Sequence, residues 1–79
     1  HIEAMQWMMR HEESNGNQEE AYRYAKELYL MKDIEGTMFL AGCYMNGYGC
    51  KRNKRLAKDL YREAAAAGSA EAKKILEDL

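Results

Sequence analysis

The sequence predicts an all-α fold, an α/α superhelix (solenoid) of about five antiparallel helices, and three observations carry that prediction. The 79 residues contain no proline, few β-branched side chains and no stretch in which polar and apolar residues alternate. Apolar residues recur instead at three- and four-residue spacing, the period of a helix that buries one face. The chain also matches itself at a shift of 36 residues, and periods in the thirties are typical of α/α repeats.

The repeat register rests on six pairs of identical residues separated by that shift. The pairs are Met9 and Met45, Asn17 and Asn53, Ala21 and Ala57, Glu27 and Glu63, Glu35 and Glu71, and Leu40 and Leu76. They fall where a helix pair needs fixed residue types, which favours one repeat module over residues 1–79. We expect a divergent first repeat over 1–34, a second repeat over 35–69 and the first helix of a third over 70–79.

Two helices are expected in the first repeat, over residues 2–13 and 18–32. A polar stretch at 14–17 separates them, and Asn17 is a plausible N-cap because its short side chain can accept from free amides of the next helix. The second of these helices carries an apolar stripe at helical spacing, formed by Ala21, Tyr24, Ala25 and Leu28. Small alanines in such a stripe let neighbouring helix axes approach closely.

Three more helices are expected over 35–46, 54–67 and 70–78. A glycine-rich stretch ends the first of them, and Asn53 is placed to cap the next, whose apolar stripe repeats that of 18–32. Gly68 and Ser69 mark the break before the last helix.

A more specific pattern runs from Leu40 to Gly68. It reads Leu-Ala-x-x-Tyr-x-x-Gly-x-Gly-Cys, followed by Asn53, Leu56-Ala57, Tyr61, Ala64-Ala65 and Gly68. This pattern resembles the Sel-one-like repeat, a branch of the tetratricopeptide-like α/α solenoids. The ordinary tetratricopeptide repeat is a poorer match, because its period is 34 and its second helix usually ends in proline. In the first repeat His11 and Glu13 replace the two glycines, so we expect that turn to be reshaped.

The resemblance implies a protein–protein interaction scaffold or adaptor that binds a partner helix or peptide on its concave face. In such solenoids the first helix of each pair lines that face. The side chains picked out by this rule are Gln6, Met9, Arg10, Glu35, Met38, Gly42, Met45, Asn46, Glu71, Lys74 and Asp78. Methionine adapts its shape to varied partners, although it also fills gaps in a core, and both interpretations stay open.

The turn after the third helix is expected to depend on Gly47, Gly49 and Asn53. Gly47 should adopt a left-handed conformation at the helix end, where a side chain would meet a steric penalty.

Cys43 and Cys50 are expected to be buried, reduced thiols. Their spacing fits neither a metal site nor a Cys-x-x-Cys redox pair. A disulfide between them is left open, and so is a redox-regulated module. They also lie outside the positions at which secreted members of the resembled family place their disulfides, which favours a reducing, cytoplasmic setting.

Charge leaves a further alternative for the function. Twelve basic and thirteen acidic residues give a net charge of −1, so nothing draws the whole chain to nucleic acid or to a membrane. The turn from Lys51 to Lys58 nevertheless carries five positive charges, while Glu12, Glu13, Glu19 and Glu20 make the corresponding first-repeat stretch acidic. We therefore expect oppositely charged ends, and binding of nucleic acid or an acidic partner through the basic turn is the alternative function.

No enzymatic activity, catalytic residue, cofactor or metal is predicted, because neither histidine has a partner at a spacing that nucleophilic catalysis requires. No membrane partner is expected. The chain is expected to be a piece of a longer solenoid that self-associates through exposed apolar ends. Those ends are formed by Ile2, Met5, Ile75, Leu76 and Leu79.

Overall fold

A computed structural model describes all residues, 1–79, and it is helical throughout, without a strand. The helices are α1 (Ile2–Ser14), α2 (Gln18–Leu30), α3 (Ile34–Asn46), α4 (Lys54–Ala66) and α5 (Ala70–Asp78). The all-α class and the five helices are confirmed, and each predicted boundary lies within about two residues of the observed one.

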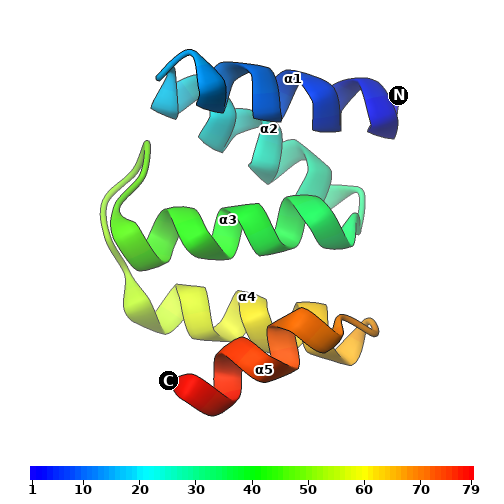
Figure 1. Cartoon of the computed structure of the whole chain (residues 1–79), viewed down its shortest axis with the longest axis vertical. Helices are drawn as coiled ribbons and strands as arrows, with labels where there is room; N and C mark the ends of the chain where they lie inside the picture. The colour runs from blue at the N-terminus through cyan, green and yellow to red at the C-terminus, as the bar shows by residue number, and fades with distance from the viewer.

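Each helix reverses the direction of the one before it and packs mainly against its neighbours in the chain (Figure 1). The helices follow one another roughly in chain order across the molecule, so the two termini lie at opposite ends of the longest axis. The whole chain measures 31 × 25 × 18 Å.

Side-chain caps start three of the helices. The side chains of Asp33, Asn53 and Ser69 each accept a hydrogen bond from the backbone N–H three residues later, at 2.9, 3.2 and 3.1 Å. Asn17 occupies the N-cap position of α2, but its side chain makes no capping bond and its Nδ2 donates to Glu12 Oε1 instead. The predicted side-chain cap is therefore confirmed for Asn53. For Asn17 the predicted position is correct, but the predicted capping hydrogen bond is not formed.

The core is a single cluster that draws on every helix and is rich in alanine. Its buried members are Met9, Ala25, Leu28, Leu40, Ala41, Ala57, Leu60, Tyr61, Ala64 and Ala72. The helices α2 and α3 approach each other closely, and a Cβ added to Gly36 would lie 2.2 Å from Leu28 Cβ. Small side chains thus hold helices together by letting backbones approach.

The turns show which residues end the helices. Gly47 follows α3 with φ 70° and Gly49 has φ 72°, the left-handed conformation that was predicted for Gly47. Lys32 after α2 also has a positive φ, 62°, which nothing in the sequence indicated, because the position carries no glycine or asparagine.

Candidate functional site

The main candidate site is a hollow that α1, α3 and α5 share. Its volume is about 340 Å³, and we call it the α1/α3/α5 hollow. The residues lining it are Met9, Arg10, Glu13, Glu35, Met38, Phe39, Tyr61, Glu71 and Ile75. All of these except Tyr61 come from the three helices that the repeat pattern places first in each pair.

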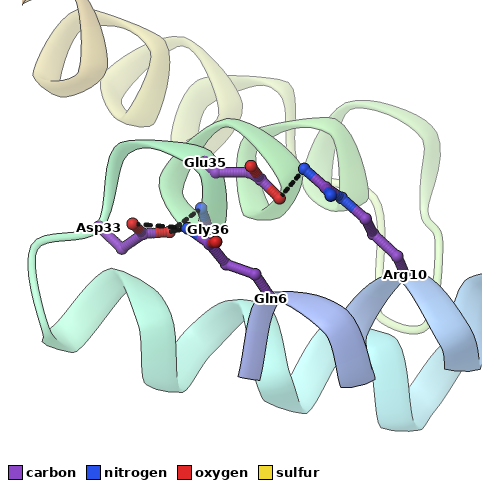
Figure 2. Close-up of polar contacts among 5 residues, drawn as sticks. All are labelled: Gln6, Arg10, Asp33, Glu35 and Gly36. Carbon is purple, nitrogen blue, oxygen red and sulfur yellow. Dashed lines mark hydrogen bonds and ion pairs between the residues drawn. The ribbon is translucent and has the colours of Figure 1, made fainter. Parts of the chain in front are cut away.

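Polar side chains of α1 reach across to the first turn of α3 beside this hollow (Figure 2). Arg10 forms an ion pair with Glu35, and Gln6 Nε2 donates to both carboxylate oxygens of Asp33, at 3.0 and 3.1 Å. Asp33 is also the cap of α3, so its carboxylate accepts from Gln6 and from the Gly36 amide together. The Arg10 side chain is 64% exposed, so the ion pair orients two side chains more than it stabilises the fold.

Five of the predicted partner-binding residues line the hollow, but they do not play equal parts. Arg10, Glu35, Met38 and Glu71 are exposed or half-buried there. Met9 is 1% exposed and belongs to the core, so the structure offers a partner almost none of its surface. The core interpretation is the correct one for Met9, while the matching Met45 is half-buried and packs against the core from outside it.

The remaining predicted residues do not line the hollow. They are Gln6, Gly42, Met45, Asn46, Lys74 and Asp78. Of these, Asn46, Lys74 and Asp78 are exposed elsewhere on the surface.

Four lining residues were missed: Glu13, Phe39, Tyr61 and Ile75. Ile75 lies one helical turn after Glu71 on α5, so helical spacing was a signal that could have found it. Glu13 was missed because it aligns with Gly49 of the second repeat, so the repeat register placed it in a turn rather than on a helix face. Nothing in the sequence indicated that Tyr61, from a second helix, would reach this hollow.

The hollow combines an apolar floor with acidic walls. Tyr61 is 7% exposed and packs with the core, and Met38, Phe39 and Ile75 are half-buried against the same cluster. Burial raises the pKa of the Tyr61 hydroxyl, and the nearby Glu71 carboxylate raises it further. The arrangement offers contacts to a side chain but holds no nucleophile beside a base.

No family model, curated protein or solved structure matches this chain. None of the five helices combines the length and apolar character that crossing a membrane requires. No three histidine, cysteine, aspartate or glutamate side chains gather closely enough to hold a metal ion.

Both cysteines are free thiols, Cys43 inside α3 and Cys50 in the loop that follows it, and their environments differ. Cys43 is 1% exposed, and burial, with smaller effects from Cys50 and Glu13, raises the pKa of its thiol to about 12. Cys50 is half-buried, less than predicted, and its Sγ donates to the Cys43 carbonyl oxygen at 3.5 Å. Burial also raises the pKa of Cys50, which disfavours the thiolate that redox exchange requires.

The basic turn and the acidic stretch occupy the same edge of the molecule, which corrects the expectation of oppositely charged ends. Figure 1 shows the α3–α4 loop rising along that edge toward the start of α2. A surface depression there is lined by residues 16–20 on one side and by Gly47, Gly49 and Cys50 on the other. The five basic side chains between Lys51 and Lys58 are all exposed, and none of them forms an ion pair.

Proposed function

We propose that this chain is part of a Sel-one-like α/α solenoid that acts as a scaffold or adaptor by binding a segment of another protein in the α1/α3/α5 hollow. The observation that carries the proposal is that one hollow draws on all three helices that stand first in their pairs. Such a surface is expected where first helices line the concave side of a superhelix.

Three features support the solenoid. Successive helices are antiparallel and pack mainly against their neighbours, as in an array where each element contacts only the next. The connections between α1 and α2, between α2 and α3 and between α4 and α5 are short. The Leu40–Gly68 pattern, with its left-handed glycines, adds the likeness to the Sel-one-like repeat.

The hollow has a size and chemistry that suit a peptide. A volume of about 340 Å³ lies at the small end of ligand pockets and accommodates a few side chains of a helix or extended segment. Met38, Phe39 and Ile75 would supply apolar contact, and Arg10, Glu35 and Glu71 would orient the partner. Recognition of a helix in a groove generally uses this combination of apolar anchors and a polar rim.

Site-specific photocrosslinking tests the proposal. A photoreactive residue is placed at Met38 in one protein and at Leu30 in another, and each is used against peptides selected from a random library. Leu30 is the matched control because it is 77% exposed and does not line the hollow. We expect the selected peptides to crosslink to the photoreactive residue at Met38. That crosslinking should disappear in the Ile75→Arg variant, whose arginine side chain fills the hollow. Equal crosslinking at Leu30, or binding unaffected by Ile75→Arg, would contradict the proposal.

A second candidate function is binding of nucleic acid or an acidic protein through the basic turn, favoured by its five exposed cations without ion pairs. Binding through exposed cations weakens steeply with salt, because counterions are released. Titration with single-stranded DNA and with polyglutamate at rising salt, on the wild type and on a Lys54→Glu, Arg55→Glu variant, tests it. Affinity unchanged by the variant would refute this function.

A further inference from the structure

We propose that the α1/α3/α5 hollow is selective for a basic segment of another protein, one in which an apolar side chain is flanked on both sides by lysine or arginine. This inference rests on the proposed function and specifies its partner. It follows from the charges that surround the floor of the hollow and from the helices that carry them.

The walls of the hollow carry three carboxylates and one cation. Glu13 lies on α1, Glu35 on α3 and Glu71 on α5, and Arg10 is the only basic residue that lines the hollow. Arg10 is paired with Glu35. Glu13 and Glu71 take part in none of the three ion pairs, and their side chains form no hydrogen bond. Two negative charges are therefore free to meet a partner.

The free carboxylates come from the two helices that lie on either side of α3 (Figure 1). Glu13 is on α1 and Glu71 on α5, while Met38 and Phe39 come from α3, the middle one of the three first-in-pair helices. A partner that lays one apolar side chain on this floor therefore meets negative charge in both directions away from it. Basic residues on both sides of that side chain would satisfy both carboxylates.

The field of these carboxylates reaches neighbouring side chains of α3, α4 and the α3–α4 loop. Glu71 adds to the raised pKa of Tyr61, and Glu13 adds to the raised pKa of Cys43 and of Tyr48. In each case burial is the larger cause. An acidic side chain entering the hollow would meet the same unfavourable field, so the walls exclude acidic segments as well as attracting basic ones.

The test uses three synthetic peptides of equal length with the same central leucine, flanked by lysine, glutamine or glutamate. Dissociation constants are measured by fluorescence anisotropy at low and at physiological salt. We expect the lysine peptide to bind most tightly, the glutamine peptide less tightly and the glutamate peptide least tightly. The dissociation constants of the lysine and glutamine peptides should differ about tenfold at low salt, and this difference should become smaller as salt screens the charges.

A charge-reversed protein provides the complementary measurement. The Glu13→Lys, Glu71→Lys double variant should prefer the glutamate peptide. The Glu27→Lys, Glu77→Lys variant is the matched control, because it changes net charge equally at two exposed sites outside the hollow. It should keep the preference of the wild type. Circular dichroism confirms that both variants are folded before their affinities are compared.

Each outcome decides between the two proposals or against both. If all three peptides bind with equal affinity and crosslink at Met38, the hollow binds peptides without charge selection, and only the present inference fails. If none crosslinks at Met38, the proposed function fails with it. If the control variant loses the preference for the lysine peptide to the same extent, the preference comes from net charge and the inference is overturned.

One outcome concerns the chain itself, because its own segment 54–58 places Leu56 between Arg55 and Lys58 and so carries the same chemistry. Sedimentation of the wild type alone at low salt is therefore included. Salt-sensitive self-association that Glu13→Lys, Glu71→Lys abolishes would make a second copy the occupant, and would overturn the assignment to another protein. A monomer under these conditions supports it.

Discussion

The two repeats share one register but end their first helices at different places. The second helices, α2 and α4, start at Gln18 and Lys54, 36 residues apart. In that register residues 11–14 correspond to 47–50, yet 11–14 are helical in α1 whereas 47–50 follow the end of α3. The first repeat therefore continues its helix by about one turn where the second repeat makes its glycine turn.

The difference follows from two residues. His11 and Glu13 are compatible with helix, so α1 continues until the polar stretch at 15–17, whereas Gly47 adopts φ 70° and ends α3. The second repeat consequently has the longer connection, which reaches back to α2. A Cβ on Gly49 would lie 2.3 Å from Gln18 O, so backbone of the loop touches backbone of the first repeat. The glycine pair thus joins the repeats as well as ending a helix.

The largest expected effect is at Gly49. Gly49→Ala adds a methyl group against Gln18 backbone at a residue with φ 72°, so strain and displacement act together. We expect a loss of about 2–4 kcal/mol in the free energy of unfolding, measured by urea denaturation. Gly16→Ala is the control, because Gly16 has φ 77° with no atom within 4 Å of its added Cβ, and should cost only about 1 kcal/mol. Equal losses would show that the loop does not press on α2.

The next effect is at Gly47, where the strain is conformational. The nearest atom to an added Cβ is Arg52 Cβ at 3.4 Å, an ordinary contact. Gly47→Val should therefore cost about 1–2 kcal/mol, the penalty of a left-handed conformation for a residue with a side chain. A thermal midpoint equal to that of the wild type would refute the role of Gly47 in ending α3.

The outcome at these turns shows what a sequence can and cannot specify. The helices and the left-handed Gly47 were predictable, because periodicity and chirality are local properties. The contact between Gly49 and Gln18 was not, since it depends on how two repeats pack. Lys32 gave no signal of its positive φ, because the backbone bonds that close α2 impose it, including the Asp33 N–H donating to Leu28 O.

The same limit applies to the candidate site. The rule that first helices line one face placed Arg10, Glu35, Met38 and Glu71 in the hollow, because it needs only the register. It could not distinguish the buried Met9 from the half-buried Met45, although both occupy one repeat position. Burial there depends on how many helices cover the side chain, and the sequence does not state which neighbours each position meets.

The repeats also differ at Tyr44, whose hydroxyl titrates at high pH. Tyr44 belongs to the second repeat, where its hydroxyl meets that of Tyr22 at 2.9 Å, and Met8 occupies the matching position in the first repeat. The hydrogen bond with Tyr22, followed by burial, raises the pKa of Tyr44 from 10.0 to about 12. The folded state thus holds this proton more tightly than the unfolded state, so the stabilisation is complete below pH 10 and is lost as pH rises toward 12.

Tyr44→Phe should remove that part of the pH dependence. At pH 8 the wild type should be more stable than the variant. This difference in unfolding free energy should decrease by about 1 kcal/mol as pH rises to 12. Other tyrosines titrate in both proteins, so the difference between the two curves is the informative quantity. Curves that stay parallel would show that the Tyr22–Tyr44 bond does not stabilise the fold.

The smallest expected difference is between the two asparagines that precede the second helices. Asn53 Oδ1 accepts from the Leu56 amide, and replacing such a cap with alanine typically costs about 1 kcal/mol. Asn17 occupies the same repeat position, but its side chain donates to the half-buried Glu12 at the surface and leaves the first amides of α2 without that acceptor. Asn17→Ala should therefore cost only a few tenths of a kcal/mol. Parallel urea denaturation of the two variants measures the difference. A loss in Asn17→Ala as large as that in Asn53→Ala would mean that Asn17 caps α2 in solution, and that the two repeats begin their second helices in the same way.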